Sequence, residues 1–289
     1  KINKNFTTVI GFRTDYYNKT QKLYHLPRIN LKYSPIDDFS LRFSLGKAIR
    51  ISNPFSENIS LFASNRDIII EDDLNPEIAL NIGGNVTYLF NIFGRKGTVN
   101  LDVYRTNFQN QVTVDLETLN TIKFYNLDGS SYSNNYQAEL YFELFEQIDF
   151  KLGHKINEVI SSYSGMGEKY VPLTPKSRSM INIACEDISE KWIIDATLNR
   201  IGEVRIPIHQ TSDFSNSETT KPYFILNSQI TRKLKNWDIY LGLENINNYT
   251  QQSPIKFSEN PLSDSFDASL IYAPLRSRLI YLGLRFKLY

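Results

Sequence analysis

The stretch SRLIYLGLRFKLY (277–289) decides the fold, because its residues separate into two faces when every second one is read. One face is entirely apolar and consists of Ile280, Leu282, Leu284, Phe286 and Leu288. The other face carries two cations and a glycine. A period of two is the β-strand period, and nine residues approach the ~9–11 that a tilted strand needs to cross a bilayer. The stretch therefore predicts a membrane-crossing strand, and its place in the chain suits the closing strand of a barrel that has no free edge.

The composition agrees with such a protein. The 289 residues carry a net charge of +1, which gives no basic field for a nucleic-acid partner. Apolar residues make up only 41% of the chain, yet aromatics reach 13%, with 18 Tyr and 18 Phe. Modest hydropathy with many aromatics is expected where one face of each strand meets lipid and aromatic girdles mark both interfaces.

Several other classes of protein and site are disfavoured. The apolar runs are too short for a transmembrane helix, and the first residues do not have the order of a secretory signal. The single Cys185 cannot form an internal disulfide, and His25, His154 and His209 lack metal-ligand spacing. We expect no catalytic residue, no metal site and no cofactor.

The same alternation recurs along the chain and predicts an all-β protein with about twelve strands. The expected strands are 6–16, 28–33, 39–50, 81–90, 99–104, 136–144, 150–156, 178–186, 192–199, 223–230, 237–244 and 277–289.

The connections between these strands alternate between short and long. The short turns are SPIDD (34–38), NIFGRKG (91–97), FEQID (145–149), EDISEK (186–191) and KLKN (233–236). The long connections are 18–27, 51–78, 107–133, 160–177, 201–221 and 245–276. Connection 107–133 holds a small hairpin, with Asp128-Gly129 as its turn signal. Short periplasmic turns and long extracellular loops are the arrangement of an outer-membrane antiparallel β-barrel.

The polar faces of the strands favour a barrel over a soluble β-sandwich. They carry charges of both signs, which a wet or plug-filled lumen tolerates and a lipid face does not, at ~2–4 kcal/mol per mid-membrane Arg or Lys. In a sandwich, one face of each strand would meet a partner sheet, and loop lengths would not sort by side. His154 and Asn182 are expected exceptions that fall on the lipid side.

Three segments resemble TonB-dependent outer-membrane receptors of Bacteroidota type. They are LPRINLKYSPIDDFSLRFSLGKAIRISNPF (26–55), NWDIYLGLENINNYTQQSPI (236–255) and FDASLIYAPLRSRLIYLGLRFKLY (266–289). The resemblance implies a 22-stranded barrel in the outer membrane of a Gram-negative cell, with an N-terminal plug domain in its lumen. Residues 1–289 would then be one domain, strands eleven to twenty-two, without the plug and its TonB box.

The resemblance also implies energised import of a scarce nutrient. The cargo could be a siderophore, a metal complex, cobalamin, an oligosaccharide or a peptide. The expected partners are outer-membrane lipid, TonB–ExbB–ExbD acting through a plug domain that is not in this chain, and a surface lipoprotein.

Candidate substrate-binding residues are those on the lumen side nearest the outer ends of the strands. They are Arg13, Asp15, Arg28, Arg50, Asn81, Gln137, Lys155 and Glu244. The alternative role for each is a contact with the plug or with the barrel wall. The loop aromatics Tyr163, Tyr170, Phe214 and Tyr249 could stack on a sugar or chelate, or anchor the interface.

Three other functions remain open at the level of sequence. A complete twelve-stranded passive channel fits the strand count. A membrane-embedded hydrolase needs a positioned Ser–His pair, and no G-x-S-x-G context accompanies the histidines. A structural or adhesion subunit of a larger outer-membrane assembly would co-purify with lipoproteins.

Overall fold

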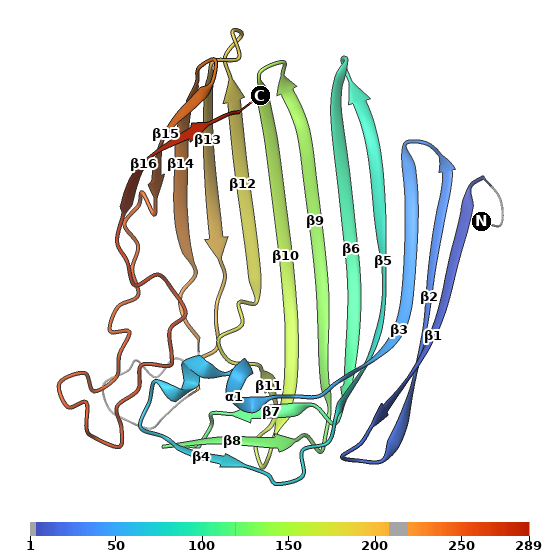
Figure 1. The fold of residues 1–289 in the computed structure, drawn as a ribbon, viewed down its shortest axis with the longest axis vertical. Coiled ribbons are helices and arrows are strands. Elements are labelled where there is room, and N and C mark those ends of the chain that lie inside the picture. Colours follow the sequence, from blue (N-terminus) through green and yellow to red (C-terminus); the bar gives the residue numbers. More distant parts are fainter. Residues whose placement is uncertain (1–3, 119, 208–218, 289) are drawn as a thin grey trace.

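The computed structural model describes residues 4–118, 120–207 and 219–288, and twelve strands form one continuous antiparallel sheet in it. Their order in the sheet is their order in the chain (Figure 1). The strands are β1 (Phe6–Tyr17), β2 (Lys22–Ile36), β3 (Phe39–Arg50), β5 (Glu77–Ile92), β6 (Arg95–Gln109), β9 (Ser131–Phe145), β10 (Ile148–Tyr163), β12 (Ser177–Glu186), β13 (Trp192–Ile201), β14 (Tyr223–Lys233), β15 (Trp237–Glu244) and β16 (Leu279–Phe286). The predicted all-β fold is confirmed.

The five predicted short turns are confirmed and lie together at one end of the sheet, which we call the turn end (Figure 1). Three of them have only two residues between their strands, and one of these joins β5 to β6 through Phe93 and Gly94, both with positive φ (53° and 80°). Two consecutive residues with positive φ form the turn that matches the twist of an antiparallel hairpin, and Gly94 adopts it without strain. The long connections lie at the opposite end, which we call the loop end.

The prediction of a long loop at 18–27 was wrong. The connection is a turn of Asn18 to Gln21, and β2 starts at Lys22, opposite Tyr17. Pro27 lies inside β2 although proline cannot donate to a sheet ladder. The pairing between β2 and β3 begins only at Arg28, however, so Pro27 has a neighbour in β1 alone.

Two other loops contain more strand than predicted. Strand β10 runs to Tyr163 and turns back into β11 (Gly167–Tyr170), so much of 160–177 is a hairpin. The expected small hairpin is present as β7 (Val112–Asp115) and β8 (Thr121–Asn126). Its turn is the segment between these strands, and Asp128-Gly129 instead lies between β8 and β9.

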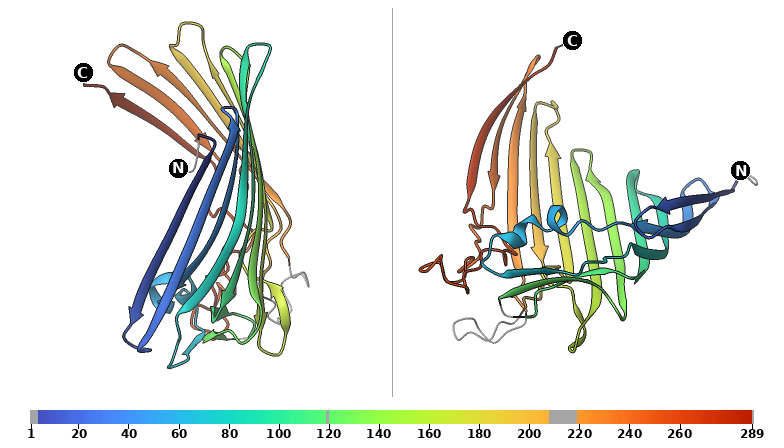
Figure 2. Two further views of the ribbon diagram at one scale, coloured as in Figure 1. Left: turned by 90° about the vertical axis from the view of Figure 1, so that its right-hand side faces the viewer. Right: turned by 60° about the horizontal axis from the view of Figure 1, so that its bottom comes forward.

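The large sheet curves into a wall that resembles half of a barrel (Figure 2). Strand β1 pairs with β2, strand β16 pairs with β15, and in the described residues the two outermost strands do not pair with each other. The register places the alternating apolar residues on the convex face, where Ile10 is 76% and Leu282 is 72% exposed. Most of the charged and amide side chains of the strands lie on the concave face, and Lys47, Arg105 and Arg200 are exceptions on the convex register.

A small compact unit fills the loop end. It contains the three-stranded sheet β4-β8-β7, with β4 (Asp67–Ile70) parallel to β8, and the short helices α1 (Pro54–Glu57) and η1 (Ile59–Phe62). Its core is made by Leu61, Val112, Leu116, Ile122 and Phe124. Segment 51–76, which joins β3 to β5 and which we call the crossbar, reaches across the concave side, as the position of α1 shows (Figure 2).

Candidate functional site

The concave face of the wall is a lattice of neutral and charged hydrogen-bonding groups. Asn85 donates to Asp102 (2.9 Å), and Asn182 donates to both Asp195 and Thr197 (2.8 Å each). Asn182 also lies opposite Lys151 of β10, so it belongs to the concave face, and its prediction as a lipid-side exception was wrong. Such a face is wettable, and a second polar surface could pack against it.

His154 remains on the convex face, as predicted. It lies opposite Ala138 and Ser179, and its Nδ1 is 2.8 Å from the Ser179 hydroxyl. This pair places a histidine beside a serine. Ser179 lies within β12, where it pairs with His154 of β10, and it is not on the sharp turn that exposes a catalytic serine. The pair therefore satisfies two polar groups on the outer surface of the wall.

The eight predicted site residues lie on the concave register but do not converge. Arg13 and Asp15 form an exposed ion pair at 2.9 Å near the β1–β2 turn. Gln137 and Lys155 are direct neighbours on β9 and β10, and Gln137 donates to Glu139. Glu244 is exposed at the far edge, opposite Leu279.

Arg28 and Asn81 come nearest to forming a joint site. They flank Gly46 in one row across β2, β3 and β5, which puts them about 10 Å apart at the usual strand spacing. The Arg28 side chain lies over Gly11 of β1, where any Cβ would collide with it. Arg28 therefore lies in mid-strand, because β2 extends to Lys22, and its prediction near the outer end was wrong.

Arg50 has a structural role in the crossbar. Its guanidinium bonds the Glu77 carboxylate and lies 3.1 Å from Glu57 of α1, while Glu77 also accepts from the Val112 amide. The Nε and Nη1 groups of the guanidinium thus each bind one carboxylate. Arg50 thus fastens the start of the crossbar to the compact unit.

The sequence reading missed two buried ion pairs at the loop end. Arg66 of the crossbar pairs with Asp267 of connection 245–276, and each side chain is 4% exposed. Arg205 pairs with Glu117, whose carboxylate also lies 3.6 Å from Lys169. The first pair joins residues 201 positions apart, so no local pattern could have indicated it.

The electrostatics of these loops reflects burial. Burial alone would raise the pKa of Glu117, but the bond and charge of Arg205, with Lys169, outweigh it and hold that pKa below its ordinary value. Burial lowers the pKa of Lys256, and Arg66 lowers it further, although Asp267 opposes both. The loops are therefore held by charges that are sensitive to the loss of any one partner.

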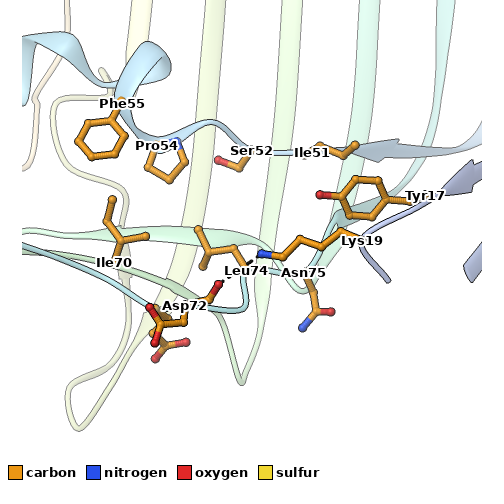
Figure 3. Close-up of a pocket in the computed structure, with 11 residues that line it drawn as sticks. Tyr17, Lys19, Ile51, Ser52, Pro54, Phe55, Ile70, Asp72, Leu74 and Asn75 are labelled. Atoms are coloured by element: carbon orange, nitrogen blue, oxygen red, sulfur yellow. Dashed lines mark hydrogen bonds between the residues drawn. The ribbon is translucent and has the colours of Figure 1, made fainter. Parts of the chain in front are cut away.

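A shallow cavity of about 230 Å³ opens between the β1–β2 turn and the crossbar (Figure 3). Tyr17, Phe55 and Leu74 contribute apolar surface, and Lys19 reaches across its mouth to the Asp72 carbonyl at 3.3 Å. A cavity with aromatic walls and charges at the rim could hold a small ring with one polar edge. The sequence reading assigned no role to these residues.

The loop aromatics differ in their surroundings. Tyr163 is 4% exposed, beneath the Arg205 guanidinium, and Tyr249 stacks on Tyr223 with ring centroids 4.5 Å apart. Tyr170 lies under the Lys176 ammonium at 4.8 Å. Phe214 lies outside the described residues. The three described rings are therefore engaged within the protein.

In the described part of the chain, no group of three or more His, Cys, Asp or Glu side chains is arranged to hold a metal ion. A search of the described residues also finds no helix of the length and hydropathy needed to span a membrane.

Comparisons with solved structures find similar folds. A point mutant of the ferric enterobactin receptor PfeA from Pseudomonas aeruginosa, in complex with enterobactin, matches with a TM-score of 0.68 and 13% identity. The siderophore receptor PiuA from Acinetobacter baumannii gives 0.63 and 15%, and the copper transporter OprC gives 0.67 and 13%. The matches cover 98%, 99% and 98% of this chain, which spans only 43%, 41% and 45% of those chains.

Sequence comparisons identify the family. No curated protein matches the chain in a sequence search. The family model described as "TonB dependent receptor-like, beta-barrel" matches residues 1–246, which is most of the chain. The match includes eleven of the twelve wall strands and the crossbar. The chain therefore belongs to the TonB-dependent receptor β-barrel family.

Proposed function

We propose that this chain forms strands eleven to twenty-two of an outer-membrane receptor that imports a scarce nutrient with TonB-derived energy. The observation that carries the proposal is the concave, hydrogen-bonding face, whose loop end is covered by the crossbar. A plug domain that precedes this segment would pack on that face and couple to TonB–ExbB–ExbD. The outer edges of β1 and β16 would pair with the remaining strands of the barrel.

A complete twelve-stranded channel is a weaker proposal. Closure of such a barrel requires its first and last strands to pair, because a free edge in lipid leaves backbone groups unsatisfied. In the described residues, β1 and β16 lie at opposite edges of the sheet. The open edges favour a larger barrel to which this segment contributes half of the wall.

Cysteine labelling tests the orientation of the receptor. In a Cys185→Ala background, Phe55→Cys in the crossbar should react with a membrane-impermeant maleimide on intact cells. Ser189→Cys in the β12–β13 turn should react only after the outer membrane is opened. Labelling of Ser189→Cys alone on intact cells would overturn the orientation and, with it, the receptor proposal.

Uptake tests the energised step. Cells that carry the full-length protein should accumulate a labelled nutrient only when TonB is present, whereas binding to the cell surface should not require TonB. A panel of ferric siderophores, metal complexes, cobalamin, oligosaccharides and peptides would identify the cargo. Uptake that persists at the same rate without TonB would indicate a passive channel.

The concave residues Arg28 and Asn81 are the proposed contacts with cargo or plug, because Gly46 leaves space between them. Arg28→Gln with Asn81→Ala should reduce uptake while surface display of the receptor is unchanged. Glu244→Gln at the far edge is the matched control. A surface lipoprotein over the loops is a further proposed partner, and co-purification with the full-length receptor tests it.

A further inference from the structure

The small sheet of the compact unit has one edge that is turned away from the wall. The order of its strands is β4-β8-β7, and β7 lies against β10 of the wall. Strand β4 is therefore the outer edge of the small sheet at the loop end (Figure 1), and β8 is its single neighbour in the described residues. Such an edge presents a row of backbone donors and acceptors that another strand can bind.

The backbone of β4 alternates between residues that face β8 and residues that face outward. The amides of Asp67 and Glu71 donate to carbonyls on the β8 side (2.9 and 3.0 Å). Because alternate residues of a strand direct their N–H and C=O groups to opposite sides, Ile68 and Ile70 direct theirs to the open edge. In the described residues, no backbone hydrogen bond from outside the sheet reaches these two isoleucines. They can therefore bond an incoming strand.

The apolar core of the compact unit continues to this edge and stops there. Ile122 of β8 is 0% exposed, whereas Ile68, which pairs with it on the same face, is 42% exposed. Ile70 packs against the same core. Exposed edge strands commonly carry Lys or Pro as protection, and the sequence of β4, Asp-Ile-Ile-Ile, has neither. An apolar side chain on an added strand would cover Ile68 and extend the core.

Acidic side chains lie at both ends of the edge. Asp67 and Glu71 are exposed and share the outer face, since they are four residues apart in an extended segment. In the part of the chain that the structure describes, neither carboxylate takes part in an ion pair. Lys123 of β8 pairs with Ile69 between the two acids and has Asp115 of β7 on its other side. The outer face of the sheet therefore carries an excess of negative charge, which favours a basic partner.

The same acids argue against a second copy of this chain as the partner. Two β4 edges paired antiparallel about Ile69 would place Asp67 of each copy opposite Glu71 of the other. Like charges directly opposite each other destabilise a strand pair, whereas opposite charges stabilise it. The edge therefore fits a different chain, with apolar residues in the middle and a basic residue at each end.

We propose that β4 binds an extended peptide as a fourth strand of the small sheet. The apolar residues of the peptide lie opposite Ile68 and Ile70. Its basic residues lie opposite Asp67 and Glu71. Backbone hydrogen bonds supply the affinity and the side chains supply the selectivity, and the peptide runs antiparallel to β4 because that pairing is slightly more stable. The inference rests on the proposed function and deepens it, because it makes a peptide the cargo that is captured at the outer mouth.

Fluorescence anisotropy with the purified full-length receptor tests the binding. The probe is a fluorescent peptide that contains Lys-Val-Thr-Val-Lys, compared with the same peptide with Glu in place of both Lys. The wild type should bind the Lys peptide at least about fivefold more tightly, because two opposite-charge pairs replace two like-charge pairs. Equal affinity for the two peptides would overturn the proposed complementarity.

N-methylated peptides test the backbone pairing. Methylation of the two valine amides removes the donors that face β4 and should abolish binding. Methylation of the threonine amide, which faces away from β4, should leave binding unchanged. Equal binding of the two methylated peptides would overturn strand addition.

Receptor variants locate the site on β4. Ile68→Pro removes an outward N–H and leaves the bonds to β8 in place, so it should abolish binding. Protection of the Glu71 amide from hydrogen exchange should show that β4 is still paired with β8 in this variant. Leu262→Ala is the control, because Leu262 is a 93% exposed apolar residue of connection 245–276, and it should bind as the wild type does. Wild-type affinity in Ile68→Pro, or an equal loss in Leu262→Ala, would overturn the site.

Uptake of the labelled Lys peptide separates this inference from the proposed function. Cells with the full-length receptor should take it up when TonB is present, and Ile68→Pro should reduce that uptake. A wild-type receptor that does not bind the peptide overturns the inference and leaves the TonB test with other nutrients unaffected. TonB-independent uptake of a peptide that still binds β4 overturns the proposed function and leaves the β4 site in place.

Discussion

Replacement of Asp267 by Asn should release the crossbar from connection 245–276 while the wall stays folded. Asp267 faces Arg66 with one carboxylate oxygen, and its other oxygen accepts from the Ser269 amide (2.8 Å) and hydroxyl (2.6 Å). Asn retains an acceptor for Ser269 but removes the negative charge. The substitution therefore isolates the charge from the shape of the side chain.

The expected magnitude follows from the burial of the pair. Both side chains are 4% exposed, and removal of one member of a buried ion pair costs about 3–5 kcal/mol. Lys256 lies close enough for Asp267 to influence its pKa, so a second positive charge remains nearby. The local opening equilibrium should shift by roughly 10²-fold to several thousand-fold, since about 1.4 kcal/mol corresponds to a factor of ten.

Amide hydrogen exchange of the full-length receptor measures this opening. The Asn65 amide donates to the Phe266 carbonyl (3.1 Å) and the Ala268 amide to the Ala63 carbonyl (2.9 Å), so both report on the contact. Their exchange should accelerate, and amides in β9 and β10 should not change. Lys176→Gln is the control, because Lys176 and Glu203 form an exposed ion pair with side chains that are 32% and 48% exposed. This substitution should shift local stability by less than ~1 kcal/mol.

Two outcomes would refute this reasoning. Unchanged exchange at Asn65 and Ala268 in the Asp267→Asn variant would mean that the ion pair does not hold the loops together. Equal acceleration in the wall strands would mean that the crossbar and wall open as one unit. The apolar double variant Arg66→Met, Asp267→Leu should recover protection, because no buried charge remains.

Two further predictions concern the closing strands and the loops. Gly283→Ala should destabilise the barrel by about 1–3 kcal/mol in thermal unfolding, because a Cβ at this position overlaps the Tyr240 ring. Gly153→Ala is the control, because the space around Gly153 is open and the substitution should not lower the melting temperature. Equal melting temperatures for the two variants would contradict this prediction. Arg205 holds the pKa of Glu117 below its ordinary value, although burial acts to raise it. The stabilisation of the loops by this ion pair should therefore be complete above about pH 4.3, the ordinary pKa of a glutamate, and should be lost as the pH falls through the lowered pKa of Glu117. The Leu173 amide donates to the Arg205 carbonyl (3.0 Å), so its hydrogen exchange reports on the stability of this loop. Lowering the pH should weaken its protection in the wild type and not in Glu117→Gln. The same response to acid in both proteins would refute the prediction.

The wall could be predicted from sequence because its determinants are local. Alternation with a period of two identifies the strands, and short turns such as Phe93-Gly94 separate them. The main error in the wall is the loop at 18–27, where β2 continues through Pro27 to Lys22. Pro27 is tolerated because β3 does not pair with it, and sequence alone does not show where a neighbouring strand ends.

The loop end and the candidate site could not be predicted, because their determinants are distant in the chain. Arg66 and Asp267 each lie in a segment that reads as polar loop, and only the curvature of the wall brings them together. The same holds for Arg50, whose register was predicted correctly but whose carboxylate partners were not. The register assigns a side chain to a face, whereas its partners depend on how the loops fold over that face.

The crossbar has a consequence for the order in which the protein is made. It emerges after the third strand of this segment and is held first by nearby residues of β5 and β8, yet Asp267, the partner of Arg66, lies 201 positions later and before the final strand. The contact between Arg66 and Asp267 therefore cannot form until nearly all of this segment has been synthesised. Loss of connection 245–276 would leave the local contacts of the crossbar in place and remove the one that ties it to the last loop.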